Sequence, residues 1–514
     1  MRPCTDFLKR HSMIVTATLF GALFFAVQLF FINEYGVSWD EPLHRNWGKI
    51  FYLFRRTGDR HFLELMPGHG IHYGPVYYFV NYLLSEKLVS MQMLSFVAAN
   101  HLLNILTASI AVGFVYALAR AVGTKRIAFL SVLFFVFFPP FIAHAHYNPK
   151  DIPLMTALLI TSFAFIHALK TSSRYSLYVA GFLFGCSIAL KVSALLMFPA
   201  FACTYFLWLY PQRAKLNLRR EFVTVIFGFL AVLAGTILAW PSAWGDLLLI
   251  PRSVLFFTHD FWPGKVLFFG QEYSGALLPW YYIPFEYATS MPVLMMLSFF
   301  TGLAAFLRLL RRQSVPIPSI FLVLWIFFPL LFSMKPGLVR YDSMRQFFFC
   351  LPAIALFAAF GFDALLVRIE RHSVHQKKYV IVCLVLLFLS LLHETVILHP
   401  FEGSYRNELV RLAVPSAMDH VFQIEYWGSS YQQGMDFLTE NAEPNPVICV
   451  PTAGILVTWY PWREDFSFEC SARSTYVMFF TRYSEAGQYA LLPMQPLLTV
   501  ERMQSELLKI YKVQ

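Results

Sequence analysis

The sequence predicts an α-helical integral membrane protein with about eleven membrane-spanning helices and a small α/β domain at the C-terminal end. Hydrophobic residues make up 58% of the 514 residues and charged residues only 14%, a composition too apolar for one soluble core. The apolar residues are gathered in long runs, whereas residues 399–514 are more polar and numerous enough for a separate small domain. The runs predict the membrane-embedded part, and the polar tail predicts the additional domain.

The first apolar run shows how the spans are recognised. Met13 to Ile32 holds about the ~20 residues that a helix needs to cross a bilayer, without a charged residue. It is longer than a signal-peptide core and has no obvious small-residue cleavage site, so we expect a retained anchor. The eleven expected spans are 13–32, 93–119, 127–143, 152–169, 175–190, 193–210, 221–240, 291–307, 318–334, 346–366 and 379–398.

The basic residues predict the orientation of these spans. Lys and Arg lie in short clusters between the apolar runs, at 120–126, 170–174, 213–220, 308–312 and 368–378. The positive-inside rule places these loops and the N-terminus in the cytoplasm. Residues 33–92, 241–290 and 399–514 then lie on the outer side. Because the positive charge is dispersed, the net charge of +10 does not indicate a nucleic-acid partner.

The outer segments carry their own structural signals. Residues 43–56 have the apolar spacing of an amphipathic interfacial helix, and the aromatic segment 261–287 is expected in the interfacial belt of the membrane. In the tail, the patterns predict strands at 447–450 and 476–480 and helices at 431–438 and 500–511. These elements predict a small α/β domain.

The seven cysteines show no metal-like spacing. Five lie at the N-terminus or in apolar segments, where a free thiol is the usual state. Cys449 and Cys470 lie in the polar tail and are able to pair if that tail is outside the cytoplasm. Sequence alone does not give the geometry that a disulfide requires, so their pairing stays open.

Carboxylates at two expected membrane boundaries are the candidate catalytic groups. Asp40 and Glu41 follow the first span, and adjacent acids there suit metal or proton chemistry on a molecule that arrives through the lipid. A solvated charge pair is the alternative. Asp151 opens the fourth span, where a carboxylate complements the helix dipole as a cap or faces the same cavity as Asp40.

Four cations are candidates for contact with a phosphate. Lys150 neighbours Asp151, and Lys191 lies between two apolar segments, where an ionisable residue is costly and usually functional unless it reaches the surface. Arg340 and Arg345 lie on the expected outer side, against the positive-inside rule, and an anionic lipid headgroup would explain them.

Two outer histidines are candidate metal ligands. His72 and His259 are able to bind a divalent metal together with carboxylates. Either residue taken singly is more often an ordinary surface histidine. A divalent metal is therefore left open as a cofactor.

Several motifs occur in an order that resembles a known group of enzymes. They are Trp39–Pro42, His72–Pro75, Asn148–Asp151, Leu278–Tyr282, Arg345–Phe349, His399–Phe401, Asn407–Leu409 and Glu425–Gly428. The layout resembles the membrane glycosyltransferases of the GT-C fold, especially bacterial relatives of protein O-mannosyltransferases and of lipid A aminoarabinose transferases.

The resemblance implies a function and assigns roles. It implies a transmembrane catalytic domain at 1–398 and an extracytoplasmic domain at 399–514, in a bacterial inner (plasma) membrane. The donor would be a sugar on polyprenyl or dolichyl phosphate, transferred on the outer face with inversion to a glycan, lipid or protein acceptor. Asp40 would be the catalytic carboxylate and Asp151 the second essential acid, with Lys191 and Arg345 near the donor phosphate. At His72 the chain departs from the aminoarabinose transferases, which puts the metal requirement in doubt.

Two other classes of function compete with a glycosyltransferase. A transporter or flippase of lipid-linked or small polar substrates would use the intramembrane charges for passage, but no paired repeats with broken helices are visible. An assembly subunit without activity would leave the acids free to change. The sequence does not distinguish a hexose from a pentose, nor identify the acceptor.

Overall fold

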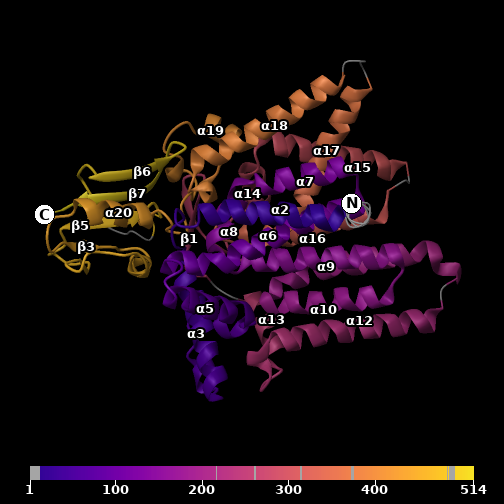
Figure 1. The fold of residues 1–514 in the computed structure, drawn as a ribbon, viewed down its shortest axis with the longest axis horizontal. Coiled ribbons are helices and arrows are strands. Elements are labelled where there is room, and N and C mark those ends of the chain that lie inside the picture. Colours follow the sequence, from indigo (N-terminus) through magenta and orange to yellow (C-terminus); the bar gives the residue numbers. More distant parts are fainter. Residues whose placement is uncertain are drawn as a thin grey trace, which may run out of the picture.

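The computed structural model describes residues 12–513 apart from 216, 260–261, 313–314, 372–375, 483 and 485–491. The long helices lie side by side over most of the molecule, and the sheet of the C-terminal tail lies at one end of the long axis (Figure 1). Helices α3 (Glu41–Thr57) and α5 (Val76–Ser90) lie beside this helical body, toward the end that carries the sheet (Figure 1).

Each of the eleven predicted apolar runs is helical. Among the described residues, eight segments are long and apolar enough to cross a membrane. They are Ser12–Phe30 (α2), Phe96–Val122 (α6), Asp151–Thr171 (α9), Val192–Ala214 (η2, α11 and η3), Leu218–Ala239 (α12), Val293–Arg311 (α15), Arg345–Glu370 (η5 and α17) and Lys378–Leu398 (within α18, Gln376–Leu398).

The remaining three predicted spans are bent or short. Helices α7 (Lys125–Val136) and α8 (Pro139–Tyr147) meet at 65° and form a ninth span if they are counted together. The bend coincides with Pro139 and Pro140, which cannot continue a preceding helix. Helices α10 (Arg174–Leu190) and α16 (Ile317–Ser333) are apolar but shorter.

The segments that the sequence analysis expects on the outer side are folded. Helix α3 confirms the predicted amphipathic helix and buries Trp47, Ile50 and Phe51 on one face. The aromatic segment contains a hairpin of β1 (Lys265–Phe268) and β2 (Gln271–Ser274), followed by α14 (Tyr282–Ser290). The other elements of these segments are α4 (His61–Glu64), η1 (Gly70–His72), η4 (Pro241–Ala243) and α13 (Leu249–His259).

The tail forms a five-stranded mixed sheet in the order β4-β3-β5-β7-β6. Strand β3 is parallel to β4 and β5, whereas β7 is antiparallel to β5 and β6. The strands are β3 (Val447–Cys449), β4 (Ser467–Phe468), β5 (Tyr476–Phe480), β6 (Leu498–Arg502) and β7 (Ser505–Lys512). Its helices are η6 (Glu402–Ser404), α19 (Glu408–Ala413), η7 (Met418–His420), α20 (Tyr431–Asn441) and η8 (Gly454–Trp459). The strands at 447–450 and 476–480 and the helix at 431–438 are confirmed.

The predicted helix at 500–511 is wrong, because this segment forms the β6–β7 hairpin. Met503 and Gln504 have positive φ angles and make the tight turn between the strands. Strand β7 pairs with β5, and this pairing buries Leu508 and Ile510. The apolar residues of the segment fit helical and strand spacing alike, so the neighbouring strand decided the outcome.

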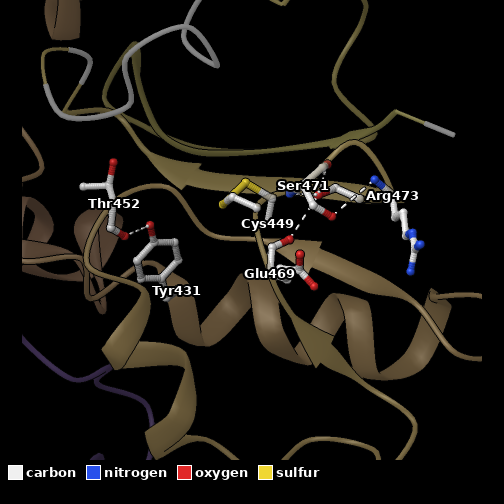
Figure 2. The surroundings of a disulfide bond; sticks show 8 residues. Tyr431, Cys449, Thr452, Glu469, Ser471 and Arg473 are labelled. Atoms are coloured by element: carbon white, nitrogen blue, oxygen red, sulfur yellow. Dashed lines mark hydrogen bonds between the residues drawn. A yellow bond between two sulfur atoms is a disulfide. The ribbon is translucent and has the colours of Figure 1, made fainter.

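The structure contains a disulfide between Cys449 and Cys470, which confirms the pairing that the sequence left open. It joins the end of β3 to the chain that follows β4, with the two Cα atoms 4.3 Å apart. Figure 2 shows the bridge beside Glu469 and Ser471, where the chain turns back toward β5.

Candidate active site

The loop that carries Asp40 is held by the C-terminal tail. The backbone N–H of Trp39 donates to the carbonyl of Trp427 over 2.7 Å. The N–H of Val37 donates to the hydroxyl of Tyr460, also over 2.7 Å. Because both partners belong to the tail, the position of Asp40 depends on how the tail packs against the loop between α2 and α3.

Two further contacts fix the same loop from other sides. The hydroxyl of Ser38 donates to the carbonyl of Tyr147 at the end of α8, over 2.8 Å. A Cβ atom at Gly36 would lie 2.0 Å from the carbonyl oxygen of Ser429, so no other residue fits at this close approach. The loop is therefore clamped between the helical body and the tail.

Five predicted residues meet in one network of charges, which we call the charge cluster: Asp40, Lys150, Asp151, Lys191 and Arg345. They come from the N-cap of α3, the start of α9, the end of α10 and the start of η5. The structure thus brings together both predicted essential acids and three of the four predicted phosphate-binding cations.

Positively and negatively charged groups alternate within the charge cluster. Arg345 donates through Nη1 to Oδ2 of Asp40 over 2.8 Å, and the same nitrogen lies 3.9 Å from Asp151. Lys191 donates to Oδ1 of Asp151 over 2.6 Å. The ammonium of Lys150 lies 3.5 Å from Asp40. Each acid therefore faces two cations.

Burial sets the electrostatics of the cluster. The side chain of Asp151 is 2% exposed and that of Arg345 5%, whereas that of Asp40 is 22% exposed. Burial alone would raise the pKa of the Asp40 carboxyl, but the charges of Lys150 and Arg345 hold its pKa well below the ordinary value. Asp40 is therefore an anion here, and it is the more accessible of the two acids.

Neighbouring polar groups orient the buried members. The side chain of Asn148 accepts the backbone N–H of Asp151 over 3.0 Å and donates to its carboxylate over 3.1 Å. Asn148 thus satisfies the N–H of Asp151 at the start of α9, and the Asp151 carboxylate points at Lys191. The guanidinium of Arg345 lies 4.6 Å from the ring centre of Trp427, which restricts its rotation.

Two residues that sequence reasoning did not single out extend the charge cluster. Asp342 accepts from Nη2 of Arg345 over 2.6 Å. Arg482, just beyond β5 in the tail, lies 3.6 Å from Asp342. Asp342 lies between the two predicted cations Arg340 and Arg345. For Arg482 the only sequence signal was a charge just after the predicted strand 476–480, and strand ends in the tail had no visible relation to the membrane segments.

The structure places Glu41 and Arg340 apart from this network. Glu41 accepts the backbone N–H of Ser38 over 2.6 Å and lies 3.1 Å from Nε2 of His101. Arg340 is buried and donates to the carbonyls of Leu278 (2.7 Å) and Pro279 (3.1 Å). These contacts stabilise the loop between α2 and α3 and the segment before α14.

Of the two predicted metal ligands, His72 and His259, the structure describes only the side chain of His72. Nδ1 of His72 lies 2.9 Å from the hydroxyl of Ser253, and its ring stacks on Phe256. The side chain of His259 lies outside the described residues. Because the carboxylates of the charge cluster are already paired with Lys and Arg, its donor set does not fit a divalent cation.

Metal-type ligand atoms do approach one another in the tail. Among the described residues, Asp419, His420 and Glu506 place such atoms within 4.8 Å of one another. Lys509 lies 2.5 Å from Glu506, so a cation already neutralises part of this group. None of these residues belongs to the predicted metal site.

A cleft of about 610 Å³ opens beside the charge cluster. Asp40 forms part of its wall together with the start of α3, the start of α6 and η8 of the tail. Its lining residues are Trp39, Asp40, Pro42, Leu43, Arg45, Asn46, Lys49, Phe96, Ile455 and Trp459. The cleft therefore gives access to Asp40, the more accessible of the two acids.

Comparison with known proteins identifies the architecture. Residues 88–240 match the family described as dolichyl-phosphate-mannose-protein mannosyltransferase. This stretch runs from the end of α5 to α12 and includes Lys150, Asp151 and Lys191. The search of curated proteins finds no match.

Solved structures extend the comparison to the whole chain. The crystal structure of ArnT from Cupriavidus metallidurans bound to undecaprenyl phosphate superimposes with a TM-score of 0.52 at 12% identity, covering 97% of this chain and 98% of ArnT. The chain has the GT-C fold. The GT-C fold implied by the sequence motifs is thereby confirmed.

Two other solved glycosyltransferases match less closely. AglB, the oligosaccharyltransferase of Archaeoglobus fulgidus in complex with an inhibitory peptide and a dolichol-phosphate, gives a TM-score of 0.48 at 12% identity over 93% of this chain and 71% of AglB. The arabinosyltransferase EmbB of Mycobacterium smegmatis gives 0.42 at 14% identity over 68% of this chain and 30% of EmbB.

Proposed function

We propose that this GT-C protein is an inverting glycosyltransferase that moves a sugar from a polyprenyl-phosphate donor to an acceptor on the outer face of the membrane. The observation that carries the proposal is the charge cluster, in which three cations and two acids from four separate elements meet. The comparison with ArnT supports it, because that structure holds undecaprenyl phosphate.

The cations suit the leaving group. In the transfer, an acceptor oxygen attacks the anomeric carbon while the bond from that carbon to the phosphate oxygen breaks. The electron pair leaves with the phosphate monoester, whose negative charge Lys150, Lys191 and Arg345 are placed to stabilise. Attack from the side opposite the phosphate inverts the anomeric configuration.

Asp40 suits the nucleophile. The acceptor hydroxyl loses its proton during attack, and Asp40 is the accessible carboxylate at the cleft. Its low pKa makes it a weak base while Lys150 and Arg345 are paired with it. A donor phosphate would compete for both cations and so raise the proton affinity of Asp40 when the substrate is bound. Donor binding would thus prepare the base.

The location is proposed on two grounds. The basic loops favour a cytoplasmic N-terminus, and the disulfide of the tail is typical of a compartment outside the reducing cytoplasm. We therefore propose a transmembrane catalytic region at 1–398 and an extracytoplasmic domain at 399–514, in a bacterial inner membrane. The charge cluster and its cleft would then face outward.

The test uses the full-length protein in lipid nanodiscs with polyprenyl-phosphate donors that carry hexoses or pentoses. Surface glycans of a deletion strain, compared by mass spectrometry with the parent, identify the missing sugar and acceptor. The anomeric configuration of the product is then read by NMR. Turnover of a lipid-linked donor with inversion is expected, and a product of retained configuration would overturn the proposed displacement.

A further inference from the structure

The cleft beside Asp40 has one polar wall along α3. Pro42, Arg45, Asn46 and Lys49 line it, and their spacing of three and four residues places them on one helix face. Asp40 occupies the N-cap position of this helix, and Lys49 lies nine positions further, about 13 Å along the helix axis. A molecule in the cleft can therefore meet Asp40 at one end and Lys49 at the other.

The charge that this wall offers to a ligand comes from Lys49. The guanidinium of Arg45 is already engaged by the hydroxyl of Ser85 (2.7 Å), the amide oxygen of Asn100 (3.1 Å) and the carboxylate of Glu86. Lys49 is exposed and has no ion-pair or hydrogen-bond partner among the described residues. Since Asp40 is neutralised by its own cations, the cleft favours an anionic ligand.

The remaining walls are aromatic. Trp39 and Trp459 line the cleft together with Phe96, which meets Trp459 edge to face at 4.8 Å. Flat aromatic rings pack well against the C–H faces of sugar rings, while the sugar hydroxyls stay available for polar groups. An acidic peptide would also pair with Lys49, but it has no flat ring face to match these walls.

We propose that this cleft is the acceptor site and that the acceptor is an anionic glycan, with a hydroxyl at Asp40 and a phosphate or carboxylate at Lys49. This inference rests on the proposed glycosyltransferase function and adds the substrate class. It also explains why the wall includes η8, because the tail then supplies Trp459 to the substrate.

Binding of small probes to the full chain in nanodiscs tests the proposal without requiring turnover. Methyl glucoside, methyl glucuronide and glucose 6-phosphate share a ring and differ in charge. We expect the two anionic probes to bind about threefold to fivefold more tightly than the neutral one at low salt, as one partly exposed charge pair allows. Octyl glucuronide, compared with methyl glucuronide, distinguishes a lipid-anchored glycan from a free one, and either result is compatible with the anionic class.

Variants of the cleft assign the contacts. Lys49→Ala should remove the preference for anionic probes, whereas Lys49→Arg should retain it. Trp459→Ala should weaken the binding of all three probes. Lys87→Ala is the matched control, since Lys87 is an exposed lysine on α5 outside the cleft lining. An unchanged preference in Lys49→Ala, or tight binding of an acidic peptide without any binding of the sugars, would overturn the proposal.

Donor binding separates this inference from the proposed function. Undecaprenyl phosphate should bind Lys49→Ala as it binds the wild type, because Lys49 lies outside the charge cluster. If undecaprenyl phosphate fails to bind the wild type while the anionic sugars still bind through Lys49, the donor proposal fails and the anionic site stands. If the phosphate binds and the sugars do not, only the acceptor inference fails.

Discussion

Arg345 donates to the carboxylate of Asp40 over 2.8 Å, although the two residues are 305 positions apart in the chain. The contact joins the loop between α2 and α3 to the start of the η5–α17 span. It also means that the candidate base and a candidate phosphate ligand neutralise each other before substrate arrives. The consequences for catalysis and stability are testable.

Replacing Asp40 by Asn should lower turnover by at least about a hundredfold, because a positioned general base contributes roughly that much. Binding of undecaprenyl phosphate should be kept or strengthened, since Lys150 and Arg345 lose a competing anion. Single-turnover transfer and direct lipid binding, measured on the same preparation, separate the two effects. Near-normal turnover would exclude Asp40 as the base.

Replacing Asp151 by Asn should reduce both transfer and thermal stability. This acid is almost fully buried, and its loss leaves Lys191 without its ion-pair partner. Thermal unfolding in nanodiscs should show a lower midpoint for Asp151→Asn than for Asp40→Asn. Equal stability of the two variants would show that the Lys191 contact contributes little to the fold.

Removing the cations should weaken donor binding. Lys191→Ala and Arg345→Ala should each lower the affinity for undecaprenyl phosphate by roughly tenfold, the scale of one charge-assisted hydrogen bond. Arg345→Lys should recover only part of the affinity, because lysine cannot reproduce the forked contacts to Asp40 and Asp342. Wild-type affinity in both alanine variants would mean that neither side chain touches the phosphate.

Glu41 should behave differently from Asp40 despite being its neighbour. Its contacts with Ser38 and His101 predict that Glu41→Gln lowers the free energy of unfolding by about 1–3 kcal/mol, with little direct effect on chemistry. Turnover per folded molecule should therefore stay near that of the wild type. A loss as large as that of Asp40→Asn in a stable protein would instead assign Glu41 to the reaction.

The buried Glu425 predicts a pH-dependent stability. Burial raises the pKa of this carboxyl from 4.5 to about 7, against the opposing effect of the N–H groups of Gly428, Trp427 and Ser429. Because the folded state holds the proton more tightly, this contribution to stability is complete below about pH 4.5 and is lost as the pH rises through 7.

The wild-type unfolding midpoint should therefore decline between pH 5 and pH 8 relative to that of Glu425→Gln, whose side chain does not titrate. The free energy of unfolding of the wild type should change with pH by at most about 1.4 kcal/mol per pH unit more than that of the variant, which is the limit for one proton. Parallel pH profiles for the two proteins would show that Glu425 is ionised throughout this range.

Topology is tested by labelling introduced cysteines in a background whose free cysteines are serine. Glu464 in the tail and Lys125 at the start of α7 are both exposed. With an impermeant maleimide, Glu464→Cys should react in intact cells and Lys125→Cys only after permeabilisation. The reverse pattern would invert the orientation and move the proposed transfer to the cytoplasmic face.

Local patterns in the sequence were sufficient for most of the helical architecture. In a bilayer there is no water to bond the backbone N–H and C=O groups, and a helix satisfies them within one segment. The helical state of apolar runs such as 13–32 and 221–240 therefore follows from composition alone. The hairpin at β6–β7 was not predictable in this way. The spacing of Leu507, Leu508 and Ile510 fits a helix and a strand alike, and only the pairing of β7 with β5 selects the strand.

The sequence by itself determined that the protein is helical and apolar, and that acids and cations lie at the ends of its spans. Only the tertiary structure decided which of these charges meet. It joined Asp40, Asp151, Lys191 and Arg345, and it assigned Glu41 and Arg340 to other contacts. The physical reason is that membrane insertion depends on short stretches of chain, whereas a buried ion pair needs packing between helices distant in sequence.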